Sequence, residues 1–69
     1  MSGRGVGPIS INIADETELA AIAEIGIQRA KRIIEYRTRH GEFESIEELT
    51  KVAGIDHKLI ETIRNVVTL

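Results

Sequence analysis

The stretch EIGIQRAKRIIEYR, residues 24–37, decides the fold of this chain. Apolar residues recur in it at spacings of three and four from Ile27 to Ile34, which predicts a helix that ends near Gly41. Gly26 stands at the start of this pattern, where a glycine permits a tight turn. The stretch therefore predicts a turn that leads into the longest helix of the chain.

A shorter helix is predicted before this turn. Asp15 is followed three residues later by Glu18, the reciprocal capping box in which each side chain accepts a free backbone N–H at a helix start. We expect this helix to run from about Glu16 to Ala23. Residues 9–13 precede it and alternate apolar with polar residues, which predicts a short extended segment against the core, too short to indicate a sheet.

The C-terminal half shows the same order of features. Ser45 and Glu48 form a second capping box, which predicts a short helix to about Val52. After a glycine, apolar residues at spacings of three and four predict a fourth helix from about His57 to Val67. The order of short helix, glycine turn and longer helix therefore occurs twice.

The two halves are related by a shift of 30 residues. When residues 18–26 are laid over residues 48–56, four of the nine positions are identical, and the capping box and the turn coincide as well. Two such units, each unable to bury its own apolar face, are expected to dock about a pseudo-twofold axis. The predicted fold is all-α, with four to five short helices in two hairpins at about 16–40 and 45–67.

Composition limits what the chain can do. With 69 residues it forms one small domain, which leaves little room for a large catalytic cleft. There is no cysteine, so disulfides, thiolate metal sites and cysteine nucleophiles are excluded. The 12 isoleucines are the predicted core. The formal net charge of −2, from 9 Lys+Arg and 11 Asp+Glu, argues against a surface coated in positive charge but allows a local basic patch.

Residues 1–8 are rich in glycine and poor in apolar groups, which predicts a flexible tail before a domain at 9–69. No apolar run approaches the roughly 20 residues that span a bilayer, and the N-terminus lacks the apolar stretch of a signal peptide. We therefore expect a soluble domain with no membrane contact of its own, either alone or within a longer exported or membrane-anchored protein.

Several motifs together resemble the ComEA-type tandem helix-hairpin-helix domain, (HhH)2. In the first hairpin the matching residues are Ile25, Gly26, Ala30, Ile33, Ile34, Tyr36 and Arg37. In the second hairpin they are Leu49, Val52, Gly54 and Ile55. The likeness extends to residues 11–13 with Glu18 and Leu19 before the first turn, and to residues 41–45 after the first hairpin, and it covers about 60 of the 69 residues. The resemblance implies a SAM-like, all-helical, non-enzymatic domain; in competence DNA uptake, domains of this type bind double-stranded DNA without sequence preference.

Elementary chemistry explains how such hairpins hold DNA. Glycines let a turn approach a phosphate closely, and the free N–H groups and positive dipole end of the following helix point at that anion. Contacts of this kind position a protein on the backbone without reading bases. The predicted DNA-contacting residues are Ile25, Gly26, Ile27, Gln28 and the flexible cations Arg29, Lys31 and Arg32 in the first hairpin, with Gly54, Ile55, His57 and Lys58 in the second.

Two carboxylates depart from the family pattern. Glu24 stands at the first glycine position of hairpin one, and Asp56 stands at the second glycine position of hairpin two. Asp56 is expected to cap the following helix by accepting the N–H of Lys58 or Leu59, which would fill the phosphate site. Glu24 can swing outward, so we expect hairpin one to carry most of the DNA affinity. The alternative is a protein-interaction or structural module that keeps the fold and has lost DNA binding.

No other chemistry is predicted. His40 and His57 have no companions at metal-ligand spacing, so each is expected at the surface or as a cap. The acidic run lacks the spaced ligands and sharp glycine turn of a calcium loop, which indicates a solvated face made of Glu42, Glu44, Glu47 and Glu48. We expect no cofactor, no metal and no catalytic residue.

Overall fold

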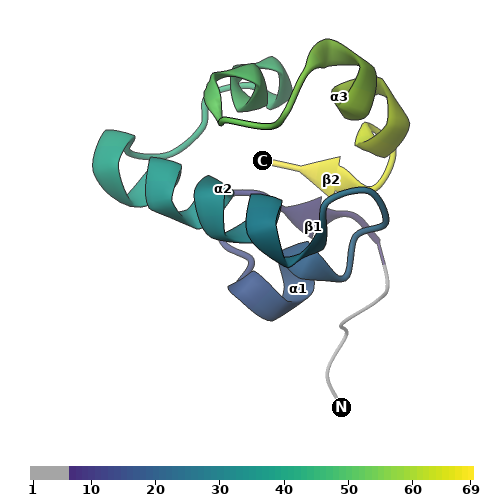
Figure 1. The fold of residues 1–69 in the computed structure, drawn as a ribbon, viewed down its shortest axis with the longest axis horizontal. Coiled ribbons are helices and arrows are strands. Elements are labelled where there is room, and N and C mark those ends of the chain that lie inside the picture. The colour runs from purple at the N-terminus through teal and green to yellow at the C-terminus, as the bar shows by residue number, and fades with distance from the viewer. Residues whose placement is uncertain (1–6) are drawn as a thin grey trace.

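Two helical pairs enclose one apolar core in the computed structural model, which describes residues 7–69 (Figure 1). Its elements are β1 (Ile9–Ser10), α1 (Glu16–Ala20), α2 (Gly26–His40), the 3-10 helix η1 (Ile46–Lys51), α3 (His57–Ile63) and β2 (Val67–Thr68). Helix α1 packs against α2, and η1 packs against α3 on the other side of the two short strands. The flexible tail predicted for residues 1–8 lies almost wholly outside the described residues.

Four helices confirm the predicted helical character, and a small strand pair is added to it. Strand β1 pairs with β2 in parallel, with Ile9 opposite Val67. The Ile9 N–H donates to the Val66 carbonyl at 2.9 Å. The prediction of a fourth helix that reaches Val67 is wrong. Helix α3 ends at Ile63, because the β-branched Val66 and Val67 leave the helix and enter the extended pairing with β1.

The capping boxes begin the two short helices. At α1 the Glu18 N–H donates to Oδ1 of Asp15 at 2.8 Å, and the Asp15 N–H donates to Oε1 of Glu18 at 3.1 Å. At η1 the Glu48 N–H donates to Oγ of Ser45 at 3.3 Å. Oε1 of Glu48, however, accepts the N–H of Glu44 at 2.9 Å in place of that of Ser45. The first capping box is therefore confirmed in full. In the second, the Ser45 half is confirmed, but the carboxylate of Glu48 binds the N–H of Glu44, one residue before the cap.

The chain at residues 9–13 is extended only over the two residues of β1 and then forms a turn. Oγ of Ser10 accepts the N–H groups of Asn12 at 3.2 Å and of Ile13 at 3.1 Å, which bends the backbone at this point. Ile11 is consequently buried, whereas Ile13 points outward and is 78% exposed. The prediction that the whole segment lies extended against the core is therefore wrong for Ile13.

Isoleucines build half of the core among the described residues, the largest share of any residue type. Seven of the 12 are buried, three more pack half-buried against them, and Ile13 and Ile27 are exposed. The order of buried, half-buried and exposed residues over 15–34 recurs unchanged over 45–64. The 30-residue repeat of the sequence is thus also a repeat of packing.

One polar side chain ties three segments of the domain together. Nδ2 of Asn12 donates to the carbonyl oxygens of Phe43 at 3.1 Å and of Leu69 at 3.4 Å, and its Oδ1 accepts the Phe43 N–H at 2.7 Å. Beside it, Nη1 of Arg37 on α2 donates to the Ile11 carbonyl at 2.9 Å. These bonds fix the first segment to α2, to the α2–η1 loop and to the end of the described chain.

Replacing Asn12 by alanine should lower the free energy of unfolding by about 1–3 kcal/mol, because the part-buried N–H of Phe43 loses its acceptor. Urea unfolding followed by circular dichroism measures this change. Thr38→Ala, at an exposed position of α2, is the control and should alter stability by no more than about 0.5 kcal/mol. Equal effects of the two substitutions would show that the Asn12 bonds do not stabilise the fold.

Candidate nucleic-acid interface

The two turns that join each short helix to a longer one have the same construction. In the first, the Ile25 N–H donates to the Ile22 carbonyl at 3.0 Å; in the second, the Ile55 N–H donates to the Val52 carbonyl at 3.1 Å. All four side chains are buried. The first turn already begins after Ala20, so α1 is shorter than predicted. Ile25 and Ile55 therefore offer a ligand only their backbone groups.

Each turn contains a residue with left-handed backbone conformation. Gly54 has φ +91°, and Glu24, its counterpart 30 residues earlier, has φ +80°. Glycine adopts this conformation freely, whereas it costs other L-residues roughly 1–2 kcal/mol. Within residues 7–69, Glu24 is the one non-glycine residue with a positive φ. The first glycine position of the family pattern therefore keeps its backbone geometry in hairpin one, although glutamate occupies it.

Arg29 on α2 joins the two turns. Its Nε donates to the Gly54 carbonyl at 2.7 Å, and its Nη1 donates to the Glu24 carbonyl at 3.3 Å. From the same helix, Nη1 of Arg32 reaches the Ala53 carbonyl at 3.5 Å. Arg29 is thus held by both hairpins, which differs from the flexible cation that the sequence predicts. Its guanidinium links the two turns by hydrogen bonds at the surface.

The two helices that follow the turns begin differently. At α3, Oδ1 of Asp56 accepts the Leu59 N–H at 2.9 Å, which confirms the predicted cap. At α2, the preceding residue is Ile25, and no side chain caps the start of the helix at Gly26. The first N–H groups of α2 are therefore open to an anion, whereas a carboxylate already occupies part of the α3 start.

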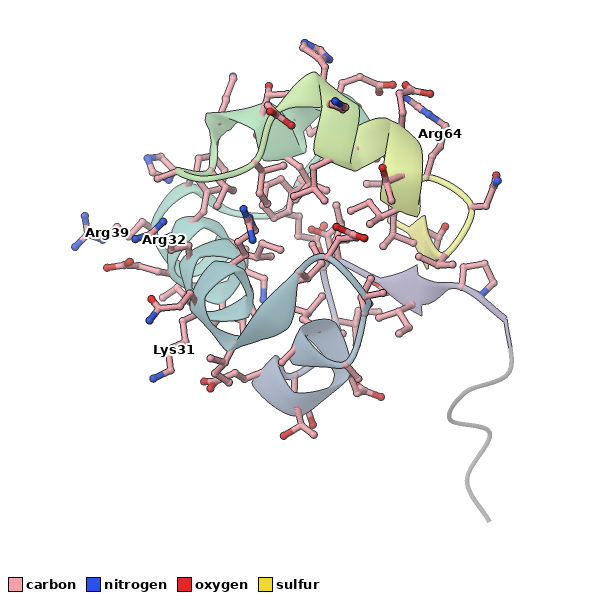
Figure 2. All side chains as sticks on the ribbon, turned by 45° about the vertical axis from the view of Figure 1, so that its right-hand side comes forward. Lys31, Arg32, Arg39 and Arg64 are labelled. Carbon is pink, nitrogen blue, oxygen red and sulfur yellow. The ribbon has the colours of Figure 1, made fainter. Side chains whose placement is uncertain are left out.

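Exposed residues surround both helix starts. Lys31 and Arg32 project outward from α2 (Figure 2), beyond the exposed Ile27 and Gln28 at its first turn. His57 and Lys58 are exposed at the start of α3. Among the described residues, no carboxylate pairs with the ammonium group of Lys31 or of Lys58. These two lysines thus carry positive charge that no described carboxylate neutralises.

An open depression of about 270 Å³ lies between the turns. Glu24 and Asp56 line it together with Arg29, Gly54 and Lys58. The structure thus gathers in one place both residues that depart from the family pattern, although they belong to different halves of the sequence. Two carboxylates and two cations share this edge, so its charge is balanced.

Two further acidic residues, Glu47 and Glu61, are engaged elsewhere. Nη2 of Arg64 contacts a carboxylate oxygen of Glu47 and one of Glu61, each at 2.8 Å, and its hydrogen bond lowers the pKa of Glu47. Figure 2 shows Arg64 on the opposite side of the molecule from Lys31. In residues 7–69, no three His, Asp or Glu side chains gather as metal ligands. None of the helices described is both long and apolar enough to cross a membrane.

This arrangement of turns and helices matches a known sequence family. A family model described as a helix-hairpin-helix motif matches residues 5–68 of the chain. The chain belongs to the helix-hairpin-helix family. The resemblance indicated by the repeated turns and the first hairpin is therefore confirmed.

Relatives of this helix-hairpin-helix domain are longer proteins. ComE operon protein 1 of Bacillus subtilis is 41% identical over 61 residues, which cover 88% of this chain and 30% of that protein. Endonuclease/exonuclease/phosphatase family domain-containing protein 1 of Danio rerio is 43% identical over 56 residues, which cover 81% of this chain and 10% of that protein. S1 RNA-binding domain-containing protein 1 of Homo sapiens is 44% identical over 50 residues, which cover 72% of this chain and 5% of that protein. The first relative confirms the predicted likeness to competence-type domains.

Arg29 is the residue of this helix-hairpin-helix domain whose position the sequence does not reveal. It lies one helical turn after the start of α2, which places it near the turn that contains Glu24. Its stronger bond goes to Gly54, however, and only the docking of the second hairpin brings that carbonyl into reach. In the sequence, the only trace of this contact is an arginine in the first turn of α2 and a glycine 25 residues later.

Glu24→Gly should raise the free energy of unfolding by about 0.5–1 kcal/mol, because glycine relieves the positive φ while adding some chain entropy to the unfolded state. Glu24→Ala keeps a Cβ at that φ and should give no such gain. Urea denaturation of both variants and the parent measures the difference. Gly and Ala variants of equal stability would mean that the left-handed backbone at this position is unstrained.

Proposed function

We propose that this domain is a non-enzymatic module that binds double-stranded DNA through backbone phosphates, without reading base sequence. In a longer protein it would serve DNA uptake or DNA processing. The observation that carries the proposal is the edge at which Arg29 bonds to both turns, through the carbonyls of Glu24 and Gly54. Two turns and two helix starts at one edge offer repeated N–H donors to phosphate oxygens. The likeness to ComEA-type domains implies the same partner.

An approximate twofold relation between the hairpins is part of the proposal. The recurrence of the burial order of 15–34 over 45–64 supports it, as does the shared hydrogen bond inside each turn. A DNA duplex has two antiparallel backbones, so a protein with twofold symmetry meets equivalent groups on both strands. Each hairpin would then contact one strand.

The two hairpins are expected to contribute unequally. Hairpin one has the uncapped start of α2 and the unpaired Lys31, so it provides both N–H donors and a cation. In hairpin two, Asp56 already accepts the Leu59 N–H and places a negative charge where a phosphate would bind. Lys58, in the first turn of α3, is the cation that can still attract a phosphate at hairpin two. Hairpin one is therefore the principal phosphate site in this proposal.

A protein partner is the second candidate. An open depression of about 380 Å³ next to the first turn is lined mostly by apolar residues, among them Ile9, Ile22 and Val66. Val66 is 46% exposed. Exposed apolar surface that borders a depression favours contact with another protein. Salt separates the two candidates, because phosphate binding weakens steeply as salt rises and apolar contact does not.

Duplex DNA binding should fall linearly on a plot of log K against log salt concentration. Fluorescence anisotropy with two labelled duplexes of unrelated sequence measures it, and the two affinities should agree. Lys31→Gln and Lys58→Gln should each reduce the slope by about 1, because each removes one phosphate contact. Binding that ignores salt, or that favours one of the two sequences strongly, would contradict the proposal.

Asp56→Asn should raise the affinity for duplex DNA severalfold at low salt while α3 keeps its cap. Asparagine accepts the Leu59 N–H as aspartate does, so only the negative charge is lost from the site. Asp15→Asn is the matched control, since Asp15 caps α1 and does not line the depression between the turns. Should Asp56→Asn bind no better than the control, hairpin two makes no contact with DNA.

A further inference from the structure

A second group of cations lies outside the two turns, on the side of α2 that faces η1. An open depression of about 240 Å³ lies between these elements. Arg32, Arg39 and Lys51 line it, and we call these three residues the α2–η1 basic face. Figure 2 shows Arg32 and Arg39 projecting from the same side of α2, across the molecule from Arg64. All three side chains are exposed, so the face is accessible to a ligand.

The acidic residues beside this face cancel only part of its charge. Glu35 forms a 3.6 Å pair with Arg39, and both side chains are more than half exposed, so the pair is weak. Glu48 is half-buried and engaged by other groups. The N–H of Glu44 lowers the pKa of Glu48, whose Oε2 also accepts the Tyr36 hydroxyl at 3.2 Å. Three exposed cations thus meet one exposed carboxylate, Glu35, and the half-buried carboxylate of Glu48, which attracts Lys51. The face keeps a positive balance on a chain whose net charge is −2.

The α2–η1 basic face is continuous with the turn of hairpin two. Arg32 belongs to both, because its Nη1 reaches the carbonyl of Ala53, which precedes Gly54 and itself lines the depression. From Arg32 to Arg39 the helix advances about 10.5 Å in two turns, so both side chains leave the same side of α2. A DNA strand that passes the turn of hairpin two would therefore meet Arg32 first and then Arg39.

We propose that the α2–η1 basic face is a second contact for the DNA backbone, which holds the strand over about three nucleotides beyond hairpin two. The inference rests on the proposed duplex binding and extends the path of the strand. The face suits phosphates better than a protein. Within the described chain, the large exposed apolar side chains lie elsewhere, at Ile13, Ile27, Val66 and Leu69.

Arg39→Gln and Lys51→Gln, singly and together, test this inference in the whole 69-residue chain. In a salt series with a labelled duplex, each single variant should lower the slope of log K against log salt by about 0.9, and the double variant by about twice that. Arg64→Gln is the matched control, because it removes one positive charge from the other side of the molecule and should leave the slope unchanged. Thermal unfolding of each variant shows that the fold persists.

Three results overturn the inference. If the parent chain binds no duplex DNA, the proposed function and this inference fail together. If the parent binds and the double variant keeps the full slope, the α2–η1 basic face alone fails. Polyglutamate supplies the third arm: if the double variant loses affinity for polyglutamate while its DNA slope is unchanged, the face serves an acidic protein instead.

Glu35→Gln provides a change of opposite sign at the same face. It frees Arg39 from its 3.6 Å pair and removes the exposed carboxylate, so affinity for the duplex should rise severalfold at low salt. Glu42→Gln removes an equal charge from an exposed residue that does not line the depression, and it should have a smaller effect. An equal rise in both variants would show that net charge alone matters, which contradicts a contact at this face.

Discussion

The guanidinium of Arg29 is the polar contact that links the turns of the two hairpins, at the edge of the apolar core that both hairpins share. It donates to the carbonyls of Gly54 and Glu24, so a single side chain on α2 bonds to both turns. Guanidinium suits this task because its donors lie in a rigid plane. A Cβ at Gly54 would lie 3.7 Å from Nε of Arg29, an ordinary contact, and 3.2 Å from Nη1 of Arg32, which would have to shift slightly.

The two halves of this domain repeat each other at a shift of 30 residues and differ at the two glycine positions of the turns. Each half keeps one of the two turn glycines: Gly26 at the start of α2, and Gly54 in the second turn. The lost positions hold Glu24, which preserves the backbone conformation, and Asp56, which preserves a helix cap. The replacements thus satisfy the fold, while both place negative charge at the edge where the turns meet. Folding and anion binding make different demands on the same two positions.

Features set by neighbouring residues could be predicted from the sequence, whereas features set by distant ones could not. The caps at Asp15 and Asp56 follow from side chains that reach a backbone N–H three residues away. The end of α3 depends on pairing between Val67 and Ile9, and no local pattern announces a partner at the far end of the sequence. Arg29 belongs to the second class, because its main acceptor lies in the other hairpin.

The parallel pairing of Ile9 with Val67 has a mechanical consequence. The first and last segments of the domain lie side by side and run in the same direction, and Asn12 bonds to the last residue as well. A pull on the two ends would therefore slide one strand along the other and load these hydrogen bonds together, before any force reached a helix. Closing so long a loop costs little more entropy than closing a short one. Under tension, the two hairpins would therefore unfold only after this short strand pair has broken.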